Sequence, residues 1–459
     1  MIPENKDQVI KRIFLVLILG GAAAFVYFSY FFQSKYLFYL LAGLFAIGSF
    51  FFVIINSKRL FYPFIALIFI LPLSSYTGFP VIIGINDIVI YAGLVIVILL
   101  SFWNNVSDNN NNGETIYLPY VFIILTAMLV LYGSIGYFKG YKITWIAREM
   151  INILYYLIPF FVIYEHKIDK FEKIIKLIVI VVFVEYILRY YFGILTLSIV
   201  RVVSRQANIV IFAFPILYLS FFSDRRIGLM ARIIRIVALT ATVILCIISM
   251  QRSLWLILSV NVIIGLIYYL FKKNFSLRAF FNLILILILL TFIVIIFIII
   301  LNQYFDILEL LSSRFNTMGN VISDEDTALN VRYQDYKNIW RSIKSESFLG
   351  SGLGAPIFQK NTGIDKEFID SSYLVILHKM GIPGLIAVIG LFMYMIFLSL
   401  KSFIKNTDRF ESLALALILI NYITISITSV AMVVYRFNLL IGIVFVIIYR
   451  YSKGQREFE

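Results

Sequence analysis

The sequence predicts an all-α, polytopic integral membrane protein: a helical bundle of about 14 spans with one large external loop of short amphipathic helices. Composition is the first observation behind this class. Hydrophobic residues make up 62% of the 459 residues and charged residues only 14%, whereas soluble domains average roughly 45–50% and about 25%. The second observation is that the apolar residues form runs of about 20, the length of a helix that crosses a bilayer.

Each apolar run is interpreted as one span, and the runs follow one another along almost the whole chain. The predicted spans are residues 13–32, 36–55, 60–74, 81–101, 117–136, 147–164, 173–193, 207–223, 233–250, 253–271, 279–301, 382–400, 410–428 and 431–449. The first run lacks a small-residue cleavage site, so we expect a span there rather than a signal peptide. An asparagine-rich stretch at 102–116 is expected to be a polar linker. The chain therefore divides into a transmembrane bundle (1–301), a large external loop (302–369) and C-terminal spans (370–459).

Basic residues set the expected orientation of these spans. Lys and Arg in the short loops concentrate on the side that holds the N-terminus, and the positive-inside rule then places both termini in the cytoplasm. The long loop accordingly lies outside. The same rule accounts for much of the net charge of +14 without a nucleic acid. We therefore expect membrane lipids as surroundings and no nucleic-acid partner.

The predicted external loop has its own internal pattern. Residues 306–315 and 327–345 have the periodicity of short helices, and the second helix is amphipathic. Its expected apolar face consists of Leu329, Tyr333, Tyr336, Ile339, Trp340 and Ile343. A helix of this kind lies over the mouth of a bundle rather than crossing the membrane. The glycine-rich sequence at 350–354 is expected to end it.

Arginines near the external ends of spans are the first candidate functional residues. They are Arg148, Arg201, Arg205, Arg252 and Arg436, joined by Arg332 and Arg341 from the loop. The guanidinium group suits bidentate binding of phosphate oxygens, so these residues could converge on one anionic ligand. Alternatively, each arginine extends to lipid head groups or pairs with a nearby acid. Arg252 is the strongest candidate, because it lies in a tight turn between two long spans with no acidic neighbour in the sequence.

Asp370 is the candidate acidic residue, since it lies where the loop gives way to a helix that runs from Ser371 onward. Such a position is usual for a helix N-cap, but a carboxylate there could also take the proton of a sugar hydroxyl as a general base. The single cysteine, Cys246, excludes disulfides within the chain, and two histidines are too few for a histidine metal site. We therefore expect neither a metal nor a cofactor.

Three features carry a resemblance to a known family. Arg332 is followed by an aromatic-rich helix and then by the glycine-rich sequence at 348–354. The Asp-Ser-Ser-Tyr-Leu sequence at 370–374 is followed by Gly-Ile-Pro-Gly-Leu at 381–385, and Arg252 lies in a tight external turn between two spans. With many spans around one large external loop, this pattern resembles the bacterial O-antigen polymerase and O-antigen ligase superfamily, and residues 332–391 carry most of the likeness.

The resemblance implies a metal-independent, inverting glycosyltransferase of the GT-C-like type with a helical membrane core in the bacterial inner membrane. It implies a polymer donor on undecaprenyl diphosphate, an acceptor repeat unit on the same lipid, and a chain-length regulator protein as a partner. The ligase branch has a His-Asn pair where this chain has Asp370 and Ser371. An acidic residue there looks more like the repeat-unit polymerase branch, whose product would be O-antigen or capsular polysaccharide.

Within this resemblance we assign site roles as expectations. Arg252 and Arg332 are expected to hold the diphosphate leaving group, because electrostatic stabilisation is the main task of such a site. Asp370 is expected to act as the base or to orient the acceptor. The expected substrate-binding residues are Arg205, Arg148, Arg341, Tyr373 and Tyr333. The two tyrosines could stack on sugars, although aromatic residues also serve ordinary helix packing.

Three other functions are compatible with the sequence. A transporter or flippase of lipid-linked oligosaccharides would explain many spans and internal cations. It would not need a large external loop, and it would favour an internal repeat, which we do not find. A ligase would share the fold and donor and pass the glycan to another acceptor. A structural membrane subunit without activity is the remaining alternative.

Overall fold

The computed structural model describes most of the chain from Tyr120 to Ser452. The described residues are 120–161, 168–191, 207–222, 228–249, 251–271, single helical positions between 288 and 343, 348–359, 364–366, 369, 371–405, 410–429, 431–433 and 435–452. The four predicted spans before residue 102, the asparagine-rich stretch 102–116 and the predicted helix start at 306–311 lie outside them.

The chain forms two compact units. Unit 1 comprises Met1–Glu114 and Asp169–Ala207, and unit 2 comprises Thr115–Ile168 and Asn208–Glu459. The described helix that lies almost wholly in unit 1 is α7, Ile168–Tyr191. Within α7, Glu172 and Lys176 are one helical turn apart and form an ion pair of 2.9 Å, which partners two of the charges in the first half of the helix.

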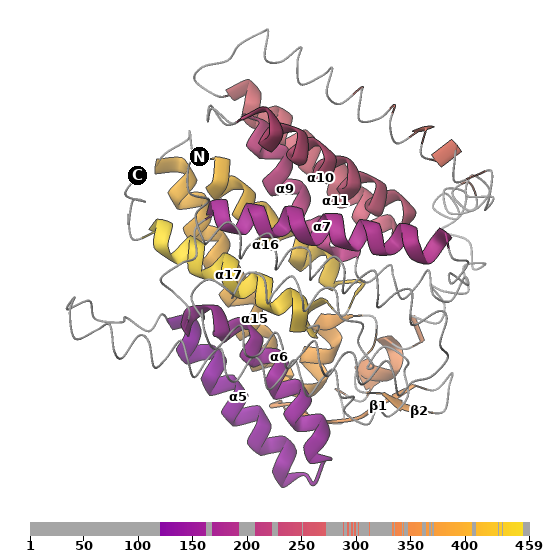
Figure 1. Cartoon of the computed structure of the whole chain (residues 1–459). Coiled ribbons are helices and arrows are strands. Elements are labelled where there is room, and N and C mark those ends of the chain that lie inside the picture. Colours follow the sequence, from indigo (N-terminus) through magenta and orange to yellow (C-terminus); the bar gives the residue numbers. More distant parts are fainter. Residues whose placement is uncertain are drawn as a thin grey trace, which may run out of the picture. The chain divides into compact units, whose positions relative to one another are not determined.

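Unit 2 is built almost entirely from helices (Figure 1). They are α5 (Tyr120–Phe138), α6 (Ile143–Phe161), α9 (Val210–Leu219), α10 (Leu229–Ile248), α11 (Arg252–Phe271), α15 (Ser372–Lys405), α16 (Phe410–Ser426) and α17 (Tyr435–Ser452), with short 3-10 turns at Ala207–Ile209, Ser220–Phe222 and Ala431–Val433. The strands β1 (Ile357–Gln359) and β2 (Ile364–Lys366) form an antiparallel hairpin in which Phe358 faces Asp365. The predicted all-α membrane class is confirmed, with this hairpin as an addition.

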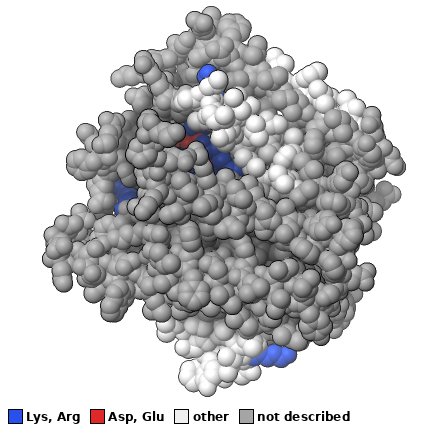
Figure 2. Space-filling view, viewed as in Figure 1, with Lys and Arg blue, Asp and Glu red and all other residues white. Residues whose placement is uncertain are grey.

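The described helices have the apolar composition that the class requires. Leu229–Ile248, Arg252–Leu270 and Ser372–Lys405 are each long and apolar enough to cross a membrane, and four shorter apolar helices accompany them. Many apolar side chains point outward; Phe397, for example, is 59% exposed and Met393 56%. The described surface in Figure 2 is accordingly mostly uncharged, with Lys or Arg beside uncharged surface at the lower tip, where the α5–α6 hairpin turns.

The predicted span at 382–400 is part of a longer helix, because α15 runs from Ser372 to Lys405. The chain breaks from helical geometry inside α15 at Gly381, where φ is 62° and ψ is −167°. Glycine tolerates this conformation, and Pro383 two residues later has no N–H to donate to the carbonyl of Lys379. The helix predicted from Ser371 onward and the predicted span are therefore two halves of one kinked element.

The helices of unit 2 alternate in direction, so that several termini lie at one end. Asn438 of α17 donates to the carbonyl of Asn152 in α6 at 2.9 Å, and Gly442 packs against Tyr156 and Pro159, so these two helices are parallel. At the start of α15, the Tyr373 hydroxyl donates to the Ile423 carbonyl near the end of α16. The end that holds the C-termini of α5 and α16 and the N-termini of α6, α15 and α17 is called the loop end below.

The remaining helices follow the same alternation. Asn421, near the end of α16, donates to Ile211 at the start of α9 and exchanges hydrogen bonds of 3.1 and 3.4 Å with Asn261 of α11. The Trp255 indole in the first turn of α11 donates to the Cys246 carbonyl in the last turn of α10 at 3.0 Å. The turn between α10 and α11, and Arg252 directly after it, therefore also lie at the loop end.

The amphipathic helix predicted in the long loop is present, but its apolar face differs from the prediction. The described residues 333–334, 336–341 and 343 are helical, and Ile339 is buried at 3% exposure. Tyr336 and Ile343 pack with it, which makes a face spaced three and four residues apart. Tyr333 and Trp340, which we expected on that face, are 61% and 53% exposed.

Candidate functional site

A glycine-rich segment, residues 350–354, is inserted among the helices at the loop end. Gly350, Gly352 and Gly354 have φ of 81°, 91° and 80°, a region that side chains with a Cβ rarely adopt. Ser351 is 3% exposed and Leu353 2%, so this part of the predicted external loop is buried in unit 2. The alternation of glycines allows the backbone to follow the surfaces of α5, α6 and α15, which together are called the seat of the segment.

The break in α15 supplies one side of the seat. In an unbroken helix the carbonyl of residue 378 would accept the N–H of residue 382, but Ile382 donates instead to Phe348 at 3.3 Å. The carbonyls of His378 and Lys379 accept the N–H groups of Ser351 and Gly352 at 2.9 and 2.8 Å. The two glycine-containing motifs noted in the sequence, at 348–354 and 381–385, are thus hydrogen-bonded to each other.

The C-terminal part of α5 supplies the second side. Leu353 donates its N–H to the Tyr132 carbonyl at 3.0 Å. A Cβ on Gly352 would lie 2.5 Å from the backbone nitrogen of Gly136, and a Cβ on Gly136 would overlap the Leu353 carbonyl. The Lys139 ammonium also donates to the Gly350 carbonyl at 3.2 Å. Glycine on both sides of this contact lets the two backbones touch.

Helix α6 supplies the third side through a buried carboxylate. Glu149 accepts the Gly354 N–H on Oε2 at 2.8 Å, and its Oε1 is in close contact with the Lys379 ammonium of α15. Glu149 is 6% exposed and Lys379 3%. His378 completes the attachment, since its Nε2 lies 3.2 Å from the Pro356 carbonyl, which can only accept a hydrogen bond.

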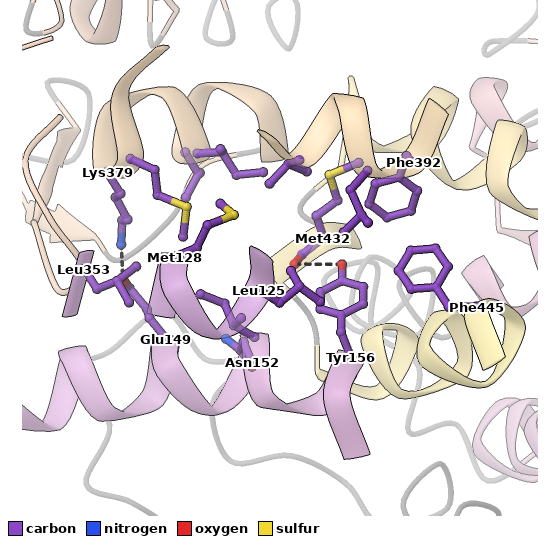
Figure 3. A pocket seen from close by; sticks show the side chains of 16 residues that line it. Leu125, Met128, Glu149, Asn152, Tyr156, Leu353, Lys379, Phe392, Met432 and Phe445 are labelled. Atoms are coloured by element: carbon purple, nitrogen blue, oxygen red, sulfur yellow. Dashed lines mark hydrogen bonds and ion pairs between the residues drawn. The ribbon is translucent and has the colours of Figure 1, made fainter. Parts of the chain in front are cut away.

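An apolar cavity lies beside this ion pair, between α5, α6, α15 and α17 (Figure 3). Lys379 and Glu149 lie at one end of it next to Leu353. Its volume is about 70 Å³, which corresponds to room for roughly five water molecules. Most of the lining is apolar and includes three methionines, Met128, Met380 and Met432. Methionine side chains adapt their shape readily, so the cavity can widen for a flexible apolar chain.

The other end of the cavity is closed by aromatic residues and a neutral polar network. Figure 3 shows Tyr156 opposite Phe392 and Phe445. The Tyr156 hydroxyl is 3.0 Å from that of Tyr422, and the Tyr422 hydroxyl donates to Asn438 Oδ1 at 2.7 Å. In a bilayer such hydrogen bonds join helices, because there is no water to satisfy the same groups.

The start of α15 is fixed by its first serine. Ser372 is fully buried; its hydroxyl donates to the Ser429 carbonyl at 2.8 Å and accepts the Met432 N–H at 3.1 Å. A small hydrophobic cluster of Ile339, Ile357, Ile369 and Val375 packs beside it. The β-hairpin and the amphipathic helix of the loop are thereby attached to the first turns of α15.

The structure places five of the predicted site residues at the loop end, on four elements. Arg252 begins α11 and Arg148 lies in the second turn of α6, and both are half-buried. Arg341 and Tyr333 are exposed on the amphipathic helix. Tyr373 is half-buried, and its hydroxyl donates to the Ile423 carbonyl at 2.9 Å, so its polar atom is engaged within the bundle. Their assigned roles remain predictions.

The other three predicted site residues, Asp370, Arg332 and Arg205, lie outside the described residues. The sequence neighbours of Asp370 are described: Ile369 and Ser371 are each 4% exposed. The chain on both sides of Asp370 is therefore held inside the fold, two residues before the fixed start of α15.

Sequence reasoning missed Glu149 and Lys379, the charged pair at the centre of the seat. A signal was available, because each lies within a predominantly apolar helical stretch, where an ionisable residue is costly unless it is partnered. Opposite charges in two such stretches are natural partners. The sequence separation of 230 residues hides the pairing.

A comparison with protein families finds a similarity. A family model described as O-antigen ligase matches residues 236–389, roughly a third of the chain. The match begins in α10, includes α11, the glycine-rich segment and the β-hairpin, and ends in α15. No curated protein matches the sequence. The family match supports the O-antigen ligase and polymerase superfamily, a glycosyltransferase-like group of membrane proteins, and a membrane role in O-antigen or polysaccharide assembly.

Proposed function

We propose that this chain is a metal-independent, inverting membrane glycosyltransferase that polymerises undecaprenyl-diphosphate-linked repeat units into O-antigen or capsular polysaccharide. One observation carries the proposal. The family match spans residues 236–389, and the described elements within it meet at one end of unit 2, where Arg252 begins α11 and Ser372 begins α15. Six of the eight predicted site residues fall within the match; Arg148 and Arg205 precede it.

The reaction requires that a sugar hydroxyl of the acceptor attack the anomeric carbon of the donor. The bond from that carbon to the diphosphate oxygen breaks, and the diphosphate leaves with the electron pair. Arg252 and Arg332 would stabilise the developing negative charge, which is the largest contribution such a site can make. Asp370 would take the proton of the attacking hydroxyl as general base. Inversion follows from attack on the face opposite the leaving group.

The position of Arg252 supports its assignment. A guanidinium at the N-terminus of a long helix adds to the positive end of the helix dipole, and both favour an anion. Arg341 and Arg148 would contribute further charge, and Tyr333, which is 61% exposed, offers a face on which a sugar could stack.

The apolar cavity supports a substrate that carries a hydrocarbon chain. It is lined by flexible methionines and aromatic rings, with Glu149 and Lys379 at one end and Asn152 between Glu149 and Tyr156. Part of the undecaprenyl chain, or a fatty chain of the surrounding bilayer, has the chemistry that this lining accepts.

The remaining parts of the proposal are the location and partners. The protein would lie in the bacterial inner membrane, with both termini in the cytoplasm and the loop end outside. A chain-length regulator protein would be its partner. The domain division into a bundle (1–301), an external loop (302–369) and C-terminal spans (370–459) belongs to the same proposal.

The ligase is the second candidate, because the matching family model is described by that activity. The two candidates share the donor and differ in the acceptor. Asp370 and Ser371 replace the His-Asn pair of the ligase branch, which favours the polymerase. The transporter, the third alternative, needs no attacking hydroxyl and no base.

The test is an assay of the purified protein with undecaprenyl-diphosphate-linked oligosaccharide extracted from the cells that carry this chain, resolved as a ladder on a gel. Wild-type protein should produce the ladder, and Arg252→Ala should lose at least about 100-fold of the rate. Arg232→Ala is the matched control, because Arg232 is an exposed arginine in the first turns of α10.

Each alternative predicts a different result in the same assay. Transfer to an added non-carrier acceptor without a ladder would indicate a ligase. Movement of the intact lipid across vesicles without new glycosidic bonds would indicate a transporter. If Arg252→Ala leaves the ladder unchanged, the protein is still a polymerase, but Arg252 does not have the role proposed for it.

A further inference from the structure

We propose that Glu149 and Lys379 are positioning residues of the transferase. Their buried ion pair holds the glycine-rich segment in its seat and so fixes the path of the chain that leads to Asp370 and the start of α15. This inference rests on the proposed function, and it assigns a role to two residues outside the arginine and aspartate set.

The contacts form a closed ring through three parts of the chain. The Lys379 ammonium donates to Glu149 Oε1, and the Lys379 backbone carbonyl accepts the Gly352 N–H. Two residues later, the Gly354 N–H donates to Glu149 Oε2 at 2.8 Å. Displacing the glycine-rich segment therefore exposes the ion pair, and separating the ion pair removes the acceptor of the segment. The segment and the two charges are mechanically one unit.

A charged pair is a costly way to join two helices in an apolar environment. The attraction between two buried charges often does no more than offset their desolvation, and apolar replacements are frequently as stable. A neutral pair can also join helices in unit 2, as the Asn261–Asn421 amides do between α11 and α16. The feature that distinguishes the ion pair is its third partner, a backbone N–H of a loop, which a carboxylate can bind strongly.

What the seat positions is the chain between Gly354 and Ser372. Its first end is fixed by Glu149, and its second end is fixed by the contacts of Ser372 with Ser429 and Met432. Lys379 and Ser372 lie on one uninterrupted stretch of α15 before the break at Gly381. Both ends of this stretch of chain are therefore attached to residues that contact or belong to the same helix, α15. Asp370 lies two residues before the second end in the sequence.

The seat should affect the rate of the chemical step (kcat) more strongly than it affects binding of the lipid donor. Misplacing a reacting group by about 1 Å can lower a rate by about 100-fold, whereas the arginines proposed to hold the diphosphate lie on other elements. Loss of the seat should lower kcat by about 10- to 100-fold and change KM for the lipid donor by less than about threefold.

The experiment compares two double variants that remove both charges. Glu149→Leu/Lys379→Met also removes the acceptor of the Gly354 N–H, whereas Glu149→Gln/Lys379→Met keeps an amide oxygen there. Neither leaves a buried charge alone, so both should fold. We expect the Leu/Met variant to keep thermal stability and lose kcat, and the Gln/Met variant to recover most of the wild-type kcat. Glu172→Leu/Lys176→Met in α7 is the matched control for loss of a helix ion pair.

Hydrogen exchange of the full-length protein in detergent supplies a readout that needs no substrate. The amides of Ser351, Gly352 and Gly354 should exchange at least about tenfold faster in the Leu/Met variant than in wild type, and remain slow in the Gln/Met variant. A Leu/Met variant with wild-type kcat, or one whose kcat falls while these amides stay protected, would overturn the proposal. A wild-type protein that forms no glycosidic bond would instead reject the proposed function, while the exchange data would still report whether the seat exists.

Discussion

Two of the buried polar interfaces in the described part of unit 2 differ in their chemistry. At the seat, a carboxylate and an ammonium join two helices to the backbone of a loop. At the junction of α9, α11 and α16, the neutral amides of Asn261 and Asn421 join helix to helix, and Asn421 also reaches the Ile211 carbonyl. In this pair of interfaces, neutral groups hold helix to helix, and a charged pair holds a segment without regular structure.

The largest expected effect comes from filling the backbone contact at the seat. Gly352→Ala would add a Cβ 2.5 Å from the Gly136 nitrogen at a φ of +91°. Because neither backbone can yield without moving a helix, we expect a loss of about 3–5 kcal/mol in the free energy of unfolding. Thermal and denaturant unfolding in detergent measures it.

Two glycines elsewhere calibrate that result. Gly265→Ala would meet the ring of Tyr218, which is 1% exposed, so it tests an overlap with a buried side chain instead of a backbone. Gly390 has open space around it in α15, and Gly390→Ala should be neutral or stabilising by up to about 1 kcal/mol. Equal losses for Gly352→Ala and Gly390→Ala would show that the backbone contact is not tight.

The next largest effect separates the charged interface from the neutral one. Glu149→Leu leaves the Lys379 ammonium buried beside an apolar group, and the cost should be about 3–5 kcal/mol. Asn421→Leu removes one amide of a neutral pair, and hydrogen bonds of this kind in membrane proteins contribute about 1 kcal/mol. The same unfolding measurement on both variants tests the comparison directly, and equal losses would contradict it.

A third variant examines the neutral network by itself. Tyr422→Phe removes a hydroxyl that lies 2.7 Å from Asn438 Oδ1 and 2.9 Å from the Ala431 carbonyl. We expect a loss of about 1–2 kcal/mol, because the single proton of this hydroxyl is removed from a buried site with two nearby acceptors. Tyr394→Phe is the control, since Tyr394 is 45% exposed. A negligible loss for Tyr422→Phe would mean that ring packing alone joins these helices.

The smallest expected effect lies at the edge of the seat. Lys139 is an exposed residue whose ammonium donates to the Gly350 carbonyl at 3.2 Å. Lys139→Ala should lower the free energy of unfolding by about 0.5 kcal/mol or less, because a contact made by an exposed charged side chain contributes little to stability. Amide exchange at Ser351 should stay within about threefold of wild type. A large effect would instead indicate that Lys139, and not Glu149, is the main side chain that holds the glycine-rich segment.

The outline of the fold was predictable because hydropathy is a local property. The spans expected at 233–250 and 253–271 appear as α10 and α11 within a few residues, since about 20 consecutive apolar residues suffice to predict each helix. Helical periodicity likewise indicated the amphipathic helix, but it assigned Tyr333 and Trp340 to the buried face. Their exposure depends on which neighbour covers the helix, and periodicity carries no information about that neighbour.

The candidate site residues likewise differ in whether their local sequence identifies them. Arg252 could be chosen from the sequence because its isolation in a turn between two spans is visible there. The pair of Glu149 and Lys379 could not, because 230 residues separate its members.

The sequence by itself determined that this is a membrane-embedded helical protein, and it supplied the motifs at 348–354 and 381–385. Tertiary structure alone decided that these motifs contact each other. The break at Gly381 redirects the N–H of Ile382 to Phe348 and leaves two carbonyls open to the glycine-rich segment. Hydropathy and periodicity act along one helix, whereas a hydrogen bond between distant backbones exists only when packing brings their atoms within about 3 Å.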